Sequence, residues 1–497
     1  MTTPSAQAVL KERRRLQHDA DVVVVGAGVF GCAIASAMAK QGRSVLLLER
    51  WMREPDRIIG ELLQPGGYSA LEKLGLADCA EEIDAVPTTG YSIIYHGDKI
   101  DLAYPKDAGA AARGGFNGSA NEKSERPEGR SFHHGRFIRR LRESCAREPN
   151  ITIVETTATS TITADHSKQV LGVTALTTDP ATGEKKQDFY FGKLTIIADG
   201  YASIFRKQYI NKTPVVKSKF YALELIDCPL PSPTRGHVIL SDAAPVLLYQ
   251  IGTHETRALI DVPPNLPAAS VAAGGVKGYI KDVILPSLPA QVRPSFAKAL
   301  EEGKLQSMPN SWLPPTTQQV PGMILVGDAM NMRHPLTGGG MTVVFNDVVL
   351  LSELLSPEKV PELSDVHSVQ SAMRQFHWQR KKLSSTVNIL AQALYALFAA
   401  DDRQLKALQN GCFQYFHRGG KCVDTPMGLL GGIIRQPFML FYHFFAVAVL
   451  SIWLVIKQTL GGLSGAWKLP LALGESVMVL YKACVVLFPF VFSELRT

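Results

Sequence analysis

A short glycine motif near the N-terminus constrains the fold more than any other feature of this sequence. Gly26, Gly28 and Gly31 form a G-x-G-x-x-G pattern that directly follows the apolar run at 22–25, and small, helix-compatible residues follow at 32–40. In such a strand–turn–helix context the first glycine allows a tight turn, the second lets the backbone approach a pyrophosphate, and the third lets helix and strand pack closely. The motif therefore predicts a βαβ nucleotide-binding unit.

The next predicted strand supports this interpretation. Residues 44–49 (SVLLLE) end on Glu49, and Arg50 follows. An acid about twenty residues after the glycines can accept hydrogen bonds from a ribose, while backbone N–H groups at the helix N-terminus face the phosphates. These features predict a bound dinucleotide, but they do not distinguish FAD from NAD.

Two later motifs favour FAD. The segment 199–206 (DGYASIFR) begins with Asp199 after an apolar strand, and Asp328 follows the predicted strand 323–326. A carboxylate at a strand end can accept a hydrogen bond from a ribityl hydroxyl. The glycines that precede Met341 would let a helix N-terminus approach the flavin edge that becomes anionic on reduction. In this order the three motifs resemble the flavoprotein hydroxylase superfamily.

Composition limits the function classes. Hydrophobic residues make up 46% of the 497 residues and charged residues 20%, which is typical of a globular chain. The net charge of +7 fits anionic lipid, an acidic partner or a plain solvated surface. Because no Lys/Arg tract is interleaved with aromatic residues, nucleic acid is not expected. The seven cysteines form no C-x-x-C pair, so we expect reduced thiols and no metal site.

The C-terminus carries two apolar stretches. The first, at 438–456, is about long enough to cross a bilayer, whereas the second, at 477–492, is short and broken by Lys482 and Pro489. Two buried core helices would be one explanation. We favour a helical hairpin that lies on or dips into one leaflet of a membrane.

These patterns predict an α/β fold with a Rossmann-like FAD-binding domain of the aromatic-hydroxylase type, a mixed-sheet substrate domain and a C-terminal helical membrane-anchoring region. No second G-x-G-x-x-G follows a strand, so no separate NADPH domain is expected. The predicted parts are a polar tail at 1–20, the FAD-binding domain at 21–87, 131–205 and 315–350, the substrate domain at 88–130 and 206–314, and the membrane-associated region at 351–497.

Three longer segments identify a family. They are 54–67 (EPDRIIGELLQPGG), 129–137 (GRSFHHGRF) and 331–341 (NMRHPLTGGGM), and together with the paired C-terminal stretches they make the chain similar to the squalene epoxidases, in particular the shorter fungal forms. The resemblance runs from about residue 20 to the C-terminus. The polar, glycine-rich loop at 105–130 departs from it.

The resemblance also implies site residues. It places Tyr91 at the active site, paired with Gln64, where Tyr91 would orient the flavin or the pocket without acting as a base. Pro335, Phe416 and Pro426 would line the substrate pocket. FAD contacts would fall on Val29, Phe30, Glu49, Arg50, Arg57, Arg130, Asp328 and Met341, beside Gly26, Gly28, Gly31 and Asp199 of the glycine and D-G motifs.

The resemblance implies an activity as well. A squalene epoxidase converts squalene to (S)-2,3-oxidosqualene with O2 through a C4a-hydroperoxyflavin, in ergosterol biosynthesis. Electrons would come from NADPH through cytochrome P450 reductase. The enzyme would sit in membrane lipid on the cytosolic face of the endoplasmic reticulum, with lipid droplets as a second location. An aromatic hydroxylase, an isoprenoid reductase of the same superfamily and a flavoprotein scaffold without turnover remain the alternatives.

Overall fold

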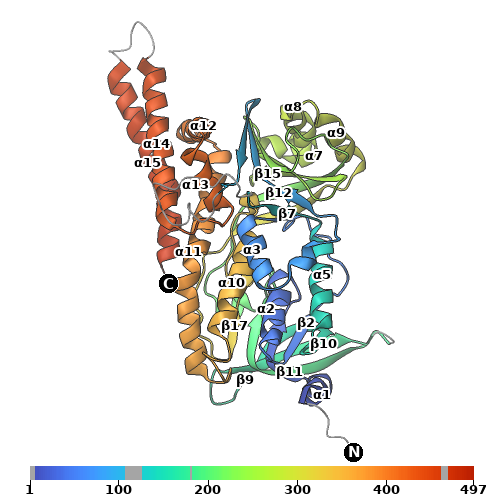
Figure 1. Ribbon diagram of the computed structural model, residues 1–497. Helices are drawn as coiled ribbons and strands as arrows, with labels where there is room; N and C mark the ends of the chain where they lie inside the picture. The colour runs from blue at the N-terminus through green and yellow to red at the C-terminus, as the bar shows by residue number, and fades with distance from the viewer. Residues whose placement is uncertain (1–5, 107–125, 180–181, 461–467, 497) are drawn as a thin grey trace, which may run out of the picture.

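The structure is a computed structural model that describes residues 6–106, 126–179, 182–460 and 468–496. Figure 1 shows an α/β region at the N-terminal end, a second sheet above it, and a column of C-terminal helices along one side. The predicted fold class is confirmed. The predicted loop at 105–130 lies largely outside the described residues.

The first sheet is built on the strand predicted at 22–25. Its seven strands have the order β8-β2-β1-β11-β10-β9, and β17 pairs with β11. β1 lies between two parallel partners, so that Val24 is opposite Leu47 on one side and Ile196 on the other. The strands are β1 (Asp19–Val25), β2 (Val45–Glu49), β8 (Ile151–Glu155), β9 (Thr157–Thr163), β10 (Val170–Thr178), β11 (Lys185–Ile197) and β17 (Met323–Leu325).

The helix predicted after the glycine motif is confirmed as α2 (Val29–Lys40), and α5 (His134–Arg147) packs beside it. The core between them and the sheet is made of small and branched residues, because α2 buries its small side chains directly on β1. The remaining short elements of this region are α3 (Pro65–Lys73), α6 (Arg206–Tyr209) and the 3-10 turns η1 (Ala77–Ala80), η5 (Gly327–Ala329) and η6 (Pro335–Thr337).

The segment at 1–20, expected to be a polar tail, contains regular structure. Residues 6–16 form helix α1 (Ala6–Leu16), and β1 already begins at Asp19. The side chain of Arg14 is 1% exposed and donates hydrogen bonds to Thr152 Oγ1 and to the carbonyl oxygen of Pro149. This buried contact attaches α1 to β8. The pattern of charged residues in the sequence does not predict it.

The second sheet also has seven strands, in the order β16-β12-β15-β14-β13-β5-β6. Only β13 and β5 are parallel, so the sheet is mixed. Its strands are β5 (Gly90–Tyr95), β6 (Asp98–Ala103), β12 (Val215–Ile226), β13 (Arg235–Leu240), β14 (Val246–Gln250), β15 (Glu255–Val262) and β16 (Gln306–Trp312).

Short elements cover one face of the second sheet and connect it to the first. The covering helices are α7 (Gly275–Tyr279), α8 (Leu285–Ser287) and α9 (Arg293–Glu302), with the π-helix Ile280–Ile284 and the 3-10 turns η2 (Pro267–Ala269) and η3 (Val271–Ala273). A small third sheet of β3 (Leu62–Leu63), β7 (Gly129–Ser131) and β4 (Val86–Thr88) joins the two regions.

The C-terminal region is helical from Gly340 onwards, as expected. It consists of α10 (Gly340–Leu354), α11 (Val366–Phe398), α12 (Arg403–His417), α13 (Lys421–Leu430), α14 (Pro437–Leu460) and α15 (Leu469–Leu495). The expectation that the second apolar segment is short was wrong, because α15 is continuous through Pro489 and has 27 residues. By length and composition, α14 and α15 are each able to cross a membrane.

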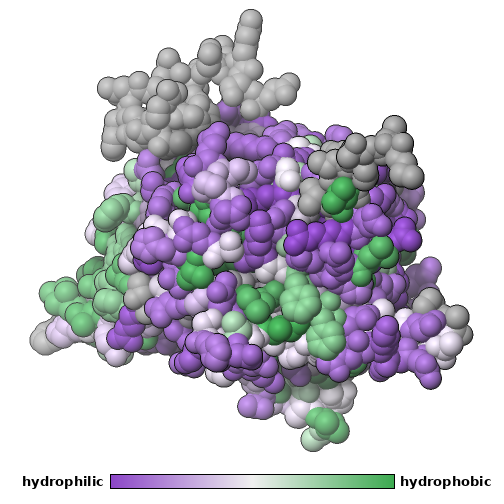
Figure 2. Space-filling view, turned by 90° about the horizontal axis from the view of Figure 1, so that it is seen from below, coloured by the Kyte–Doolittle hydropathy of each residue, from purple (hydrophilic) through white to green (hydrophobic). Residues whose placement is uncertain are grey.

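α14 and α15 lie side by side and stand out from the rest of the molecule (Figure 1). Their outer side chains are apolar and exposed, among them Phe438 at 88%, Tyr442 at 66% and Trp453 at 61%. Figure 2 shows a mostly hydrophilic surface from below, with hydrophobic residues gathered at the left edge, on the side of these helices. The pair therefore presents an apolar surface of the kind that marks a membrane interaction site.

A buried ion pair between α10 and α11 gives the first testable prediction. Arg380 donates hydrogen bonds from Nε and Nη2 to the Asp347 carboxylate, the shortest at 2.6 Å, and both side chains are buried. We expect Asp347→Ala to lower the free energy of unfolding by about 3–5 kcal/mol, because it leaves a buried guanidinium unpaired. Denaturant unfolding in detergent measures this change.

The control lies on the same helix. Glu353 of α10 pairs with Lys359 at 3.0 Å, but both side chains are exposed. Glu353→Ala should change the free energy of unfolding by less than about 1 kcal/mol. Equal effects of the two substitutions would contradict the assignment of the Asp347 pair to the core.

Candidate functional site

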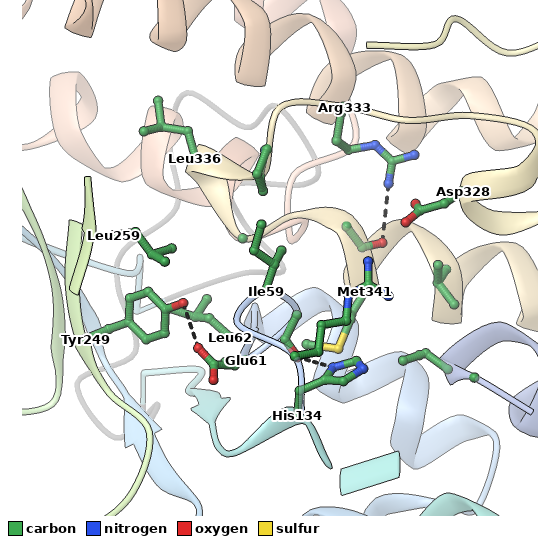
Figure 3. A pocket seen from close by; sticks show the side chains of 18 of the residues that line it. Ile59, Glu61, Leu62, His134, Tyr249, Leu259, Asp328, Arg333, Leu336 and Met341 are labelled. Carbon is green, nitrogen blue, oxygen red and sulfur yellow. Dashed lines mark hydrogen bonds between the residues drawn. The ribbon is translucent and has the colours of Figure 1, made fainter. Parts of the chain in front are cut away.

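A cavity opens between the two large sheets. Its walls come from segments that are far apart in the sequence: the loop after β1, the segment before β3, β5, β14, β15 and the loop that leads into α10. Figure 3 shows Tyr249 and Leu259 of the second sheet on one side, Asp328 and Arg333 on the other, and Ile59 and Met341 between them. The cavity thus has one polar end and one apolar end.

The glycine motif forms the polar end, and its three glycines have different surroundings. A Cβ atom on Gly31 would lie 1.7 Å from the carbonyl oxygen of Gly26, and one on Gly26, whose φ is +100°, would lie 2.6 Å from that of Ala198. A Cβ on Gly28 would meet no protein atom within 4 Å. The outer glycines are therefore needed for packing, whereas Gly28 faces the open cavity at the N-terminus of α2, where a phosphate group could approach.

Glu49 fixes the glycine loop from the end of β2. One carboxylate oxygen accepts a hydrogen bond from the Ala27 N–H at 2.7 Å, and the other accepts one from the Trp51 N–H at 3.1 Å. Arg50 is exposed, and its guanidinium lies 3.8 Å from the centre of the Trp51 ring. Neither Glu49 nor Arg50 lines the cavity.

Arg142 is part of this site and was missed in the sequence. It lies 3.3 Å from Glu49 Oε2 and donates a hydrogen bond to the carbonyl oxygen of Ala27 at 2.9 Å. It is buried on the same face of α5 as Leu141 and Cys145. A basic residue on the apolar face of a predicted helix was the signal that could have found it.

The D-G motif at 199–206 contacts the loop that carries Asp328. Asp199 does not line the cavity; it is half-buried, and its carboxylate accepts a hydrogen bond from the Ile204 N–H at 3.2 Å. Burial raises the pKa of Asp199. Arg206, from the same segment, donates a hydrogen bond to the carbonyl oxygen of Asp328 at 3.1 Å. The motif therefore holds the loop that carries Asp328.

The loop between β17 and α10 completes the polar end. Asp328 and Met341 line the cavity as predicted, together with Arg333. A Cβ on Gly340, at the first turn of α10, would meet no protein atom within 4 Å. The N-terminus of α10 is thus a second helix end that is open to a ligand, and its positive dipole favours negative charge there.

Tyr91 and Gln64 are brought together as the sequence resemblance implied. Gln64 donates hydrogen bonds to Tyr91 Oη at 2.7 Å and to the carbonyl oxygen of Thr337 at 2.6 Å. The Tyr91 hydroxyl donates to the same Thr337 oxygen at 3.3 Å. Burial raises the pKa of Tyr91, so its hydroxyl stays protonated. Tyr91 lines the cavity, and Gln64 lies fully buried behind it.

Tyr104 completes this cluster and was not predicted. Its hydroxyl donates a hydrogen bond to Gln64 Oε1 at 2.5 Å. Together with the hydrogen bonds that Gln64 Nε2 donates to Tyr91 and Thr337, this contact fixes the orientation of the Gln64 amide. Nothing in the local sequence distinguishes Tyr104 from the other tyrosines. Tyr104 follows β6, and only the tertiary fold brings it next to Gln64, which precedes α3.

The apolar end of the cavity is lined by Ile59, Leu62, Leu247, Leu259 and Leu336, and by Tyr249. One buried ion pair lies in this wall. Arg257 contacts Glu61 at 2.8 Å, and the Tyr249 hydroxyl donates to Glu61 at 3.1 Å. Since the charges of Glu61 and Arg257 are paired with each other, this end presents mainly carbon atoms to a ligand.

The remaining predicted residues are distributed as follows. Pro335 and Arg57 line the cavity. Arg130 lies on β7 with its guanidinium 4.8 Å from the centre of the Tyr68 ring, outside the cavity wall. Phe416 is buried in α12 and Pro426 lies inside α13; neither lines the cavity, and their pocket roles stay predictions.

Comparison with known proteins places this cavity in context. The family model described as squalene epoxidase matches residues 191–466, and a model of an NAD(P)-binding Rossmann-like domain matches 24–52. Among solved structures, p-nitrophenol 4-monooxygenase PnpA from Pseudomonas putida has a TM-score of 0.65 at 19% identity and covers 84% of this chain and 98% of its own. PqsL from Pseudomonas aeruginosa, described as a probable FAD-dependent monooxygenase, has a TM-score of 0.59 at 17% identity over 78% of this chain and 98% of its own.

Curated relatives match along almost the whole chain. A squalene epoxidase of Gibberella zeae is 58% identical over 99% of both chains. A squalene epoxidase of Saccharomyces cerevisiae is 40% identical over 96% of both, and a squalene monooxygenase of Mus musculus is 39% identical over 96% of this chain and 78% of its own. By the family model and by these identities, this chain belongs to the squalene epoxidase family.

Proposed function

We propose that this protein is an FAD-dependent monooxygenase that epoxidises squalene with O2 to (S)-2,3-oxidosqualene, in ergosterol biosynthesis. The observation that carries the proposal is the cavity itself, because one continuous space joins a dinucleotide cradle to an apolar chamber. An enzyme that oxidises a hydrocarbon needs both in contact. The family to which the chain belongs is named for the same reaction.

The polar end suits FAD. Gly28 at α2 and Gly340 at α10 leave room for two negatively charged parts of a ligand at two helix N-termini, and Asp328 offers an acceptor for a ribityl hydroxyl. Bound FAD, once reduced, supplies the activation of O2. The residues that would hold it are Gly28, Val29, Phe30, Arg57, Asp328 and Met341 in the cavity wall, with Gly26, Gly31, Glu49, Arg50, Arg130 and Asp199 around it.

The apolar end suits a hydrocarbon. Squalene has no polar group to bind, so its affinity must come from burial of apolar area, at about 25 cal/mol per Å². Leu62, Leu259 and Leu336 supply such area, and the Glu61–Arg257 pair leaves no unpaired charge in the wall. A phenol, the substrate of an aromatic hydroxylase, would need polar partners at this end.

Tyr91 would act as a positioning residue between the two ends. Its hydroxyl is engaged by Gln64 and Thr337, and Thr337 precedes the glycines at the start of α10. It therefore connects the wall of the apolar chamber to the loop beside the flavin, and its raised pKa keeps the hydroxyl protonated, so it is not expected to act as a base.

We also propose that electrons reach the flavin from NADPH through cytochrome P450 reductase, and that the protein is anchored in the endoplasmic reticulum membrane, facing the cytosol. The exposed apolar faces of α14 and α15 support the anchor. A membrane location also suits a substrate that partitions into lipid. The net charge of +7 would favour an acidic partner surface.

A pair of glycine substitutions tests FAD binding. In Gly28→Ala the added methyl group occupies open space that a phosphate would need, so FAD affinity should fall about tenfold or more while the FAD-free protein keeps its thermal midpoint. Gly31→Ala should instead destabilise the FAD-free protein, because its methyl group meets the Gly26 carbonyl. Flavin fluorescence and thermal unfolding give the two readouts, and loss of stability in both variants would contradict the assignment.

The reaction itself is tested with purified protein in detergent, supplied with FAD, P450 reductase, NADPH, O2 and squalene. Mass spectrometry should detect 2,3-oxidosqualene only when all components are present. NADPH consumption that needs no reductase and is stimulated by phenols would move the function to an aromatic hydroxylase. A saturated product formed without O2 consumption would indicate an isoprenoid reductase, and bound FAD without any turnover would indicate a scaffold.

Tyr91→Phe tests the positioning role. We expect kcat for epoxidation to fall about tenfold, because a hydrogen bond worth about 1 kcal/mol or more is lost from the loop beside the flavin, while FAD stays bound. Tyr279→Phe is the control, since Tyr279 is also buried but packs among the core residues that lie under α7–α9. Full epoxidation activity in Tyr91→Phe would remove this role.

A further inference from the structure

A buried acid lies where the apolar helix α15 ends. Glu494 is 3% exposed, although it is the next-to-last residue of a helix whose outer side chains are apolar. Figure 1 places this end of α15 against α11, far from the tip of the α14–α15 hairpin. A buried carboxylate costs several kcal/mol unless it is paired, so its partners are of interest.

Two residues of α11 contact Glu494. The Asn388 side-chain amide donates to Glu494 Oε1 at 2.7 Å, and Lys381 donates to the backbone carbonyl oxygen of Glu494 at 2.6 Å. Asn388 and Lys381 are themselves buried. The end of α15 is thus joined to α11 by hydrogen bonds within the protein.

The orientation of the Asn388 amide follows from its neighbours. Its nitrogen faces two acceptors, Glu494 Oε1 and Asn331 Oδ1, and its oxygen accepts a hydrogen bond from Arg333 Nε at 2.7 Å. A rotated amide would place its nitrogen against the guanidinium and its oxygen against the carboxylate. Together with Asn331, Glu494 therefore favours the orientation in which Asn388 accepts a hydrogen bond from Arg333.

Of these three hydrogen-bonded residues, Glu494, Asn388 and Arg333, it is Arg333 that lines the cavity. It lines the cavity beside Asp328, and Figure 3 shows its guanidinium pointing toward the start of α10. It also donates to the carbonyl oxygen of Gly340 at 3.3 Å and to Asn331 Oδ1 at 2.9 Å. Burial lowers the pKa of Arg333, and the carboxylate of Asp328 opposes that shift.

We propose that Glu494 is a positioning residue of the flavin site: acting through Asn388, it holds the Arg333 guanidinium at the cavity wall, where that cation stabilises bound FAD. The end of the apolar C-terminal hairpin thereby sets the geometry of the cofactor site. This inference rests on the proposed binding of FAD in the cavity.

A double-mutant cycle on the full-length protein in detergent tests the link. We expect Glu494→Leu to raise the dissociation constant of FAD about tenfold, because Asn388 is no longer oriented, and Arg333→Leu to raise it at least as much. If Glu494 acts through Arg333, the double variant should bind FAD no more weakly than Arg333→Leu alone. Flavin fluorescence measures the affinity, and thermal unfolding of the FAD-free proteins measures stability separately.

Two further variants test whether the effect of Glu494 comes from its hydrogen bond, from its negative charge or from a general destabilisation of α15. Glu494→Gln keeps an acceptor oxygen for Asn388, so its FAD affinity should stay within about twofold of the wild type. Glu475→Leu removes a carboxylate from the same helix, where it pairs with Arg403 at 2.8 Å, and should leave the affinity unchanged. Should Glu494→Leu fail to fold, Asn388→Leu replaces it in the cycle and tests the link at its middle.

The outcomes are distinguishable. Two outcomes would overturn the inference: additive effects of the two substitutions on FAD affinity, or an unchanged FAD affinity in a folded Glu494→Leu or Asn388→Leu variant. Neither outcome would affect the proposed function as long as the wild-type protein binds FAD. Failure of the wild-type protein to bind FAD would instead overturn the proposed function. Equal weakening by Glu475→Leu would show that α15 acts through general stability and not through Arg333.

Discussion

The parallel pairing of β1 and β17 with β11 is the constraint on which the site depends. In parallel strands the carboxyl ends lie at one edge of the sheet, so the loops after β1, β11 and β17 emerge together. These loops carry Gly26, Asp199 and Gly327, which are far apart in the sequence. The loops that form the nucleotide-binding site lie together because the strand register places Ile196 beside both Val24 and Ile324.

The parts of the molecule that could be predicted from the sequence are those that local chemistry determines. The strand–glycine–helix unit, the strand before Asp328 and the helical C-terminus each have a signal within a few neighbouring residues. Tyr104 and the hydrogen-bonded series Arg333–Asn388–Glu494 have none, because their roles come from contacts between elements that meet only in the folded protein. The length of α15 was misjudged because Pro489 and Lys482 were taken as breaks, whereas the helix tolerates both.

Tyr91 illustrates an intermediate case. Neither its position in the predicted strand nor its neighbours distinguish it from other tyrosines, and only family resemblance pointed to it. The structure gives a physical reason: Gln64, held by Tyr104 on one side and Thr337 on the other, fixes the Tyr91 hydroxyl. Gly236 leaves room for the ring, since a Cβ at this position would lie 2.9 Å from Tyr91 Cε1. Resemblance identified the residue, and packing explains its role.

The apolar core around the cavity is continuous with the C-terminal hairpin. Leu62, Tyr91 and Leu336 belong to the same buried cluster as Ala448 of α14 and Ala483 of α15. Deleting the hairpin to obtain a water-soluble enzyme would therefore remove one wall of the catalytic core. A soluble form would have to keep both helices and replace only their outward side chains, such as Phe438, Tyr442 and Trp453, with polar ones.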